Sequence, residues 1–205
     1  MRRLVIDTAT RICSVALFEG DACLAAFHED IGRGHAERLV PMIAQLPDKG
    51  RADIIHVDIG PGSFTGIRVG VSAARALALA WGADCHGYSC LELVAAIARN
   101  GATVAIDAVM TGGHGEVYFQ SFGADGSAID PAQSLLPESA SKASVADCVA
   151  GDIAQKITGL RGSGQAIVLL PNAQAWQRIA GLTPLSPSPL YVRSPDAKLP
   201  GGITP

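Results

Sequence analysis

The sequence predicts an α/β protein of two lobes, each with a mixed β-sheet and flanking helices. In the first hundred residues, short apolar runs alternate with segments of helical spacing, an order that requires a mixed sheet covered by helices. A second unit begins near Asn100 and opens as the first does, with an apolar run that ends in an acid. Of the 205 residues, 48% are apolar and 17% are charged, which excludes a disordered chain and allows a core without disulfides.

The first lobe is predicted to span residues 1–100. Three short apolar runs separated by polar turns are typical of an antiparallel meander, and these are residues 4–7, 13–18 and 22–27. Apolar residues at helical spacing predict a helix over 35–46, in which Pro41 should cause a kink. A buried strand is expected at 54–59 and a long helix at 64–81. This order is also the one with which the nucleotide-binding half of actin-like and sugar-kinase proteins begins.

The second lobe, residues 101–205, gives weaker signals. Its predicted elements are strands at 103–107, 117–122 and 167–170, a short helix at 173–179, and an intervening stretch of loop, helix and loop at 123–165. The tail from Thr183 holds six prolines and is expected to be extended and partly mobile.

The most specific segment is GPGSFTGIRVG, residues 60–70. It joins a strand to a helix N-terminus, where unpaired amides and the helix dipole favour an anion. The candidate nucleotide- or anion-binding residues are Asp7, Thr8, Gly60, Gly62, Ser63 and Thr65. The alternative is that the aspartate and the hydroxyl residues only cap turns and the helix.

The helix at 64–81 is apolar or small almost all round, with Arg68, Ser72 and Arg75 on one narrow stripe. A helix of this kind is buried on more than one side. One face can cover the sheet, and the small-residue face allows a second helix to approach. That second helix is either the one at 35–46 or a helix of another chain, and the pattern does not separate the two.

Composition and motifs exclude several functions. The chain has five histidines and five cysteines but no HExxH, CxxC or GxSxG motif, so no catalytic residue and no metal ligand is expected. The net charge is −3 and the basic residues are scattered, so the chain is not expected to bind nucleic acid on its own. Reduced cysteines and the lack of a long apolar run predict a cytoplasmic protein without membrane contact.

The chain resembles the TsaB (YeaZ) family. The resemblance rests on GPGSFTGIRVG together with LVIDTATRICSVAL at 4–17, GHAERLVPMI at 34–43, VAIDA at 104–108 with GEVYF at 115–119, and PLYVRSPDA at 189–197. It covers nearly the whole chain. Two departures stand out: Val109 replaces a family arginine, and the loop at 109–114 is lengthened.

The resemblance implies an actin-like ATPase (ribonuclease H-like) fold with a reduced second lobe. It implies a non-catalytic scaffold or activating subunit in the synthesis of threonylcarbamoyladenosine at tRNA position 37. Such a subunit pairs with TsaD through two helices of its first lobe, recruits TsaE, and meets tRNA only through the complex. No cofactor is expected on this chain, because ATP acts at the partner subunits.

The expected partner-interface residues lie on the two helices of the first lobe: His35, Leu39, Ile43, Ile67, Gly70, Val71, Ala74 and Ala78. Glutamate at Val71 or Ala74 should then abolish TsaD binding and leave the fold intact. A homodimer through the same face is a further expectation.

The alternative function is an enzyme, either a glycoprotease-like metallopeptidase (M22) or an ATP-binding actin-like protein. The resemblance to TsaD places its metal-binding histidines at Cys90 and Val94, which supply no imidazole.

Overall fold

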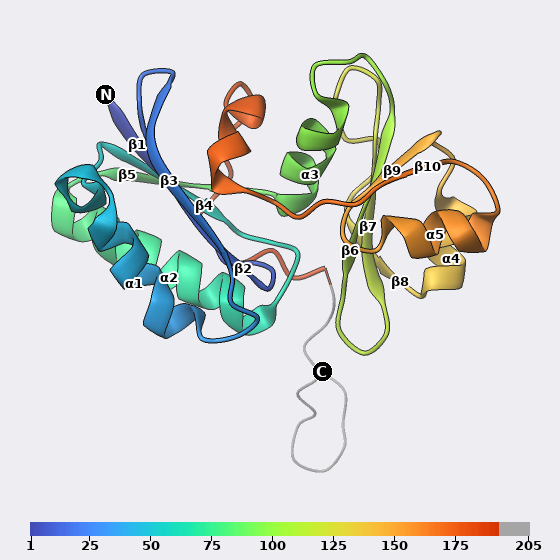
Figure 1. Ribbon diagram of the computed structural model, residues 1–205, viewed down its shortest axis with the longest axis horizontal. Coiled ribbons are helices and arrows are strands. Elements are labelled where there is room, and N and C mark those ends of the chain that lie inside the picture. Colours follow the sequence, from blue (N-terminus) through green and yellow to red (C-terminus); the bar gives the residue numbers. More distant parts are fainter. Residues whose placement is uncertain (193–205) are drawn as a thin grey trace, which may run out of the picture.

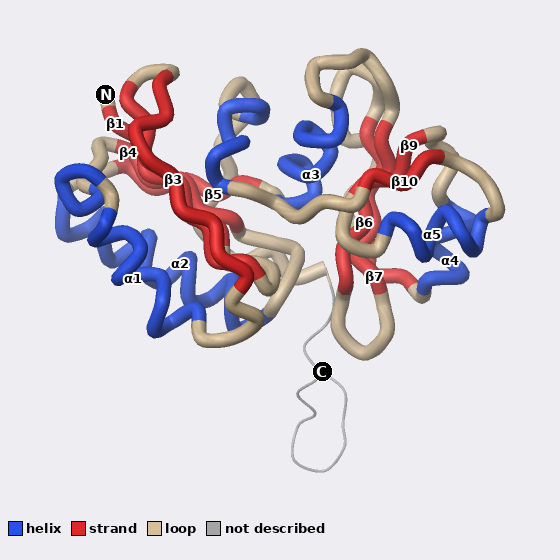
Figure 2. Tube along the Cα trace, in the orientation of Figure 1, coloured by secondary structure: helices blue, strands red, loops and turns tan. Residues whose placement is uncertain are grey.

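The first sheet forms around β1 (Arg2–Asp7), whose residues from Leu4 to Asp7 are fully buried. Its five strands have the order β3-β2-β1-β4-β5, in which β2 runs antiparallel to both of its neighbours, β1 and β3, and β4 and β5 run parallel to β1. The other strands are β2 (Ile12–Glu19), β3 (Ala22–Asp30), β4 (Ile54–Asp58) and β5 (Asp84–Tyr88). The computed structural model describes residues 1–192, and Figures 1 and 2 show the two sheets with their helices.

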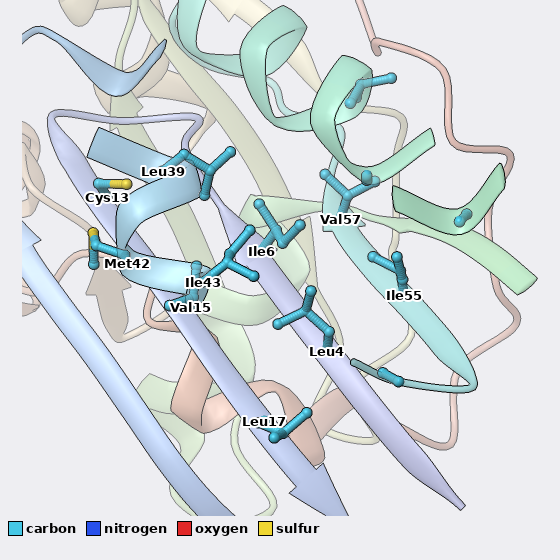
Figure 3. Packing of buried hydrophobic residues seen from close by; sticks show 14 of the residues in the cluster. Leu4, Ile6, Cys13, Val15, Leu17, Leu39, Met42, Ile43, Ile55 and Val57 are labelled. Atoms are coloured by element: carbon cyan, nitrogen blue, oxygen red, sulfur yellow. The ribbon is translucent and has the colours of Figure 1, made fainter. Parts of the chain in front are cut away.

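Both faces of this sheet are covered. Helices α1 (His35–Gln45) and α2 (Phe64–Trp81) lie on one face and build the main apolar core, part of which is drawn in Figure 3. A short 3-10 helix, η1 (Pro47–Gly50), follows α1. Helix α3 (Cys90–Arg99) and the 3-10 helix η2 (Ala173–Ile179) pack against the other face. The burial of β1 on both sides explains its uninterrupted apolar sequence.

The second sheet has the order β10-β9-β6-β7-β8 and is smaller. Its strands are β6 (Ile106–Thr111), β7 (Val117–Phe122), β8 (Gln133–Leu135), β9 (Cys148–Ala150) and β10 (Gln165–Ile167), and its own helices are α4 (Pro137–Ala143) and α5 (Ala154–Arg161). Helix α3 stands between the lobes, because Leu91 and Val94 join the second core whereas Leu93 joins the first. The predicted α/β architecture with a reduced second lobe is confirmed.

Several predicted boundaries are wrong. The strand expected at 103–107 is β6, three residues later, and the strand expected at 167–170 is β10, two residues earlier. The stretch 123–165 holds two strands and two helices instead of one helix between loops. The part of the predicted extended tail beyond residue 192 lies outside the described residues.

The chain end does not stay with the second lobe. Helix η2 packs on the first sheet through Trp176, and Leu185 forms a two-way backbone bridge with Gly87 at the edge strand. The amide of Leu190 donates to the Ile59 carbonyl at 2.8 Å. The predicted division at residue 100 therefore needs a correction, because residues 173–192 complete the first lobe. Within residues 1–192, none of the helices is long and apolar enough to cross a lipid bilayer.

Candidate functional site

A cleft of about 960 Å³ opens between the lobes. On the first lobe it is lined by the turn between β1 and β2 and by the loop that leads into α2. The hairpin between β6 and β7 faces them from the second lobe, and residues 190–192 close one side. A cleft of this size can hold a small molecule such as a nucleotide.

The glycine-rich loop is packed against the neighbouring turn. A side chain at Gly62 would come within 2.1 Å of the Ala9 carbonyl, and one at Gly66 within 2.1 Å of the Thr8 carbonyl. The Ser63 amide donates to the Ala9 carbonyl at 2.6 Å. These glycines therefore serve close approach between two parts of the chain itself.

The six candidate anion-binding residues do not form one site. Gly62 and Ser63 reach the cleft, and Ser63 also caps α2 by accepting from the Gly66 amide at 3.2 Å. Thr8 is buried and donates to the Gly66 carbonyl at 2.8 Å. Three further positions are placed elsewhere: Asp7 and Gly60 are buried beneath the cleft, and Thr65 is exposed away from its lining. A nucleotide at the cleft stays a prediction.

Asp58 is a buried acid that the sequence analysis missed. It ends β4 as Asp7 ends the adjacent parallel strand β1, and both side chains are 0% exposed. Burial raises the pKa of Asp7 to about 7, and burial together with the neighbouring charge of Asp7 raises that of Asp58 well above its ordinary value. The signal was present in the sequence, since two neighbouring apolar runs each place an acid at the same sheet edge.

The second lobe has a buried acid at the corresponding place, but its partners are complete. Asp107 accepts hydrogen bonds from the hydroxyls of Ser121 (2.6 Å) and Ser144 (2.8 Å) and from the Ala146 amide (2.9 Å). Arg161 donates to the Ser144 hydroxyl at 2.9 Å. This network fixes the loop between α4 and β9 and leaves Asp107 no role at the cleft.

The chain end is fixed at the rim of the cleft by an aromatic cluster. The Arg68 guanidinium lies 3.6 Å from the centre of the Phe64 ring, and its Nε donates to the Tyr191 hydroxyl at 2.8 Å. The two rings are 5.1 Å apart between centroids. This cluster holds residues 190–192 beside the N-terminus of α2.

The eight predicted partner-interface residues are buried in this chain. Six of them belong to the main apolar core: Leu39, Ile43, Ile67, Val71, Ala74 and Ala78. The partner interface stays a prediction, and because these positions are buried in the single chain, glutamate at Val71 or Ala74 would disrupt the fold. Other residues form the solvent-facing sides of the two helices: Val40 is 56% exposed on α1 and Leu79 is 86% exposed on α2.

Cys90 and Val94, the two positions at which the resemblance would require metal-binding histidines, are both buried. The Cys90 thiol donates to the Pro61 carbonyl at 3.0 Å, and Val94 is in the apolar core of the second lobe. Across residues 1–192, no three histidine, cysteine or acidic side chains are grouped so that they could bind a metal ion.

Comparison with known proteins gives a consistent result. Residues 27–146 match the family model described as TsaD, tRNA N6-adenosine threonylcarbamoyltransferase. The tRNA threonylcarbamoyladenosine biosynthesis protein TsaB of Escherichia coli is 39% identical over 61% of this chain and 56% of its own length. TsaB of Bacillus subtilis is 31% identical over 49% of this chain and 46% of its own length, so the chain spans about half of these curated relatives.

The solved structure of YeaZ from Pseudomonas aeruginosa is similar over nearly the whole fold. It superposes with a TM-score of 0.77 and 28% identity, covering 93% of this chain and 99% of that one. The expected fold and the resemblance in sequence are thereby confirmed. The final segment of that resemblance, residues 189–197, is described only as far as residue 192.

Proposed function

This chain belongs to the TsaD family and is similar to its TsaB (YeaZ) relatives, and on that basis we propose that it is a non-catalytic subunit in the synthesis of threonylcarbamoyladenosine at tRNA position 37. It pairs with a TsaD homologue and supports recruitment of a TsaE homologue. ATP acts at those partners in the cytoplasm, and tRNA contacts the assembly through TsaD.

The observation that carries the proposal is the outer face of α1 and α2. Both helices lie on the same side of the first sheet (Figure 1), and their solvent side carries Val40 and Leu79 among small residues such as Ala36, Ala44 and Ala76. An 86% exposed leucine beside small side chains allows a partner helix to pack closely. The same face supports a homodimer as a resting form that TsaD would displace.

The residues at two positions bear on the proposed non-catalytic role. The positions aligned with metal-binding histidines are Cys90 and Val94, and neither supplies an imidazole ligand. A metallopeptidase activity therefore finds no support in these residues.

Measuring the affinity of variants for the TsaD homologue tests whether the outer face of α1 and α2 is the interface. Leu79→Glu and Val40→Glu place charge on the proposed interface, and Val145→Glu is the matched control because Val145 is 81% exposed on the second lobe. We expect the first two to weaken binding in calorimetry at least tenfold, with unchanged thermal unfolding, and the control to bind as the parent does. Equal affinity for all three would refute the interface.

Reconstitution tests the role. TsaD, TsaE and the threonylcarbamoyl-AMP synthase of the same source are incubated with ATP, threonine, bicarbonate and tRNA, with and without this chain. We expect modification to require the chain, and Leu79→Glu to reduce it. Equal modification without the chain would contradict the proposal.

The remaining alternative is a nucleotide-binding protein. The cleft is large enough, and Gly62 and Ser63 line it. Calorimetry of this chain alone with ATP and Mg²⁺ separates the two: sub-millimolar binding would favour the alternative.

A further inference from the structure

Two buried carboxyl groups lie side by side beneath the cleft. Asp7 and Asp58 end adjacent parallel strands, one residue beyond the paired positions Ile6 and Val57. Neither side chain is exposed, and the two carboxyl groups interact with each other. Two neighbouring carboxylates in an apolar interior repel one another, and neither charge is hydrated.

Each carboxyl is only half satisfied. Asp7 Oδ1 accepts from the Ala9 amide at 3.4 Å and Asp58 Oδ1 accepts from the Gly60 amide at 2.6 Å. The Oδ2 atom of each receives no hydrogen bond from the described residues. A proton bound between the carboxyl groups would supply the missing donor.

Among residues 1–192, no positively charged group acts on the pKa of either carboxyl. The titratable side chains that face the pair are Cys13 on β2, Tyr88 on β5 and Cys90 at the start of α3, with Asp152 of the second lobe acting on Cys90. Burial raises the pKa of each of the two thiols and of the phenol, so all three are neutral at neutral pH. The Tyr88 hydroxyl donates to the Ile6 carbonyl at 3.2 Å.

We propose that Asp7 and Asp58 form a carboxyl pair that stays protonated near neutral pH, and that its deprotonation as the pH rises loosens the two turns on the first-lobe side of the cleft. The pair is at the base of both turns through the amides of Ala9 and Gly60. The turns are joined to each other by the Ser63 amide and the Ala9 carbonyl. Repulsion between two charged carboxylates would separate the strand ends and weaken that bond. The inference is independent of the proposed function.

The sign of the effect follows from proton binding. The pKa of each carboxyl is higher in the folded chain than in the unfolded one, so the folded state binds more protons. The stabilisation is complete below the unfolded pKa and is lost as the pH rises through the folded one. The pKa of His56 is lowered to about 4, and burial raises the pKa of the Cys13 and Cys90 thiols. These groups are unchanged in a variant of the pair, so their contribution to the pH dependence cancels when that variant is compared with the parent.

Unfolding in urea at several pH values tests the pair. The comparison is with the double variant Asp7→Asn, Asp58→Asn. Between pH 6.5 and 8, the folding equilibrium constant of the parent should fall at least roughly thirtyfold relative to that of the double variant. This change corresponds to the release of one proton per molecule on unfolding over about 1.5 pH units. Asp107→Asn is the control, because this buried acid of the second lobe has a full set of donors. It should be less stable at every pH and keep the slope of the parent.

Two measurements on the parent protein decide the matter if the double variant does not fold. Carbon NMR of labelled aspartate should show two carboxyl carbons that ionise far above the others. Exchange of the Ser63 amide, corrected for base catalysis, should rise above neutral pH. Ionisation of every aspartate below pH 6, or equal slopes in the parent and the double variant, would overturn the proposal, as would a flat slope in Asp107→Asn.

Discussion

Replacing Gly66 by alanine tests the close contact between α2 and the turn after β1. In an exposed helix this change stabilises by about 0.5–1 kcal/mol, because alanine loses less backbone entropy. Here the new methyl carbon would be 2.1 Å from the Thr8 carbonyl oxygen, and that oxygen is backbone. The first turn of the helix must therefore move away from the sheet.

Two effects contribute to the loss in free energy of unfolding that we expect for Gly66→Ala. Overpacking in a filled core costs about 1–3 kcal/mol. Displacement also weakens the buried bond from the Thr8 hydroxyl to the Gly66 carbonyl, 2.8 Å long, worth about 1 kcal/mol. After the helix propensity gain, Gly66→Ala should lower the free energy of unfolding by about 1–3 kcal/mol. Gly70→Ala should act in the same direction, because its methyl would be 2.4 Å from the Thr8 hydroxyl oxygen.

Urea unfolding measures the effect, and a third glycine provides the control. Gly159 lies in α5 with no atom within 4 Å of the position a methyl would take, and its backbone is outside the left-handed region. Gly159→Ala should raise the free energy of unfolding by up to about 1 kcal/mol. If Gly66→Ala were as stable as the parent or more so, the account of the loop as a packing element would be wrong.

Three further predictions concern separate sites. Asp107→Ala leaves two serine hydroxyls and one backbone amide without their acceptor and should cost about 3 kcal/mol in denaturant unfolding, so a loss under 1 kcal/mol would contradict the network. Burial, with neighbouring His86 and Arg3, lowers the pKa of His56 to about 4. The contribution of His56 to the free energy of unfolding is therefore complete above pH 6.5 and falls by about 3 kcal/mol toward pH 4. His56→Phe should remove this acid sensitivity in thermal unfolding. Tyr191→Ala removes the bond from Arg68 and should speed amide exchange at Leu190 while the midpoint of unfolding changes by less than about 4 °C, and unchanged exchange would show that the aromatic cluster does not hold the chain end.

The first lobe was largely predictable because its signals are local. The three strands of the meander are separated by polar turns, and α1 and α2 show their periodicity within one window. The second lobe was not, since β8, β9 and β10 have three residues each and depend on tertiary pairing. Helix α3 was used only as an alignment position, although its sequence carries a half-buried stripe with Glu92 and Arg99 at helical spacing.

The candidate site shows a different limit. Ile67 and Ala74 are apolar and on a helix buried on two sides, which suits a partner surface as well as an internal core. Residue type cannot tell these apart, because both environments exclude water. Only the structure identifies Leu79, the residue directly after the buried Ala78, as an outward residue. Asp58 was missed for another reason: its partner Asp7 is 51 residues away.

The return of the chain end to the first sheet has a consequence for synthesis on the ribosome. The Ala173 amide donates to the Ser14 hydroxyl, a contact between residues 159 positions apart, and Trp176 stacks on His56 with ring centroids 4.1 Å apart. The first lobe is translated long before these partners emerge. The part of the sheet face that η2 covers must therefore stay apolar and exposed until most of the polypeptide has been made. Contacts of such sequence separation slow folding and leave an intermediate open to aggregation. A nascent chain arrested before residue 173 should accordingly depend on chaperones to a degree that the finished protein does not.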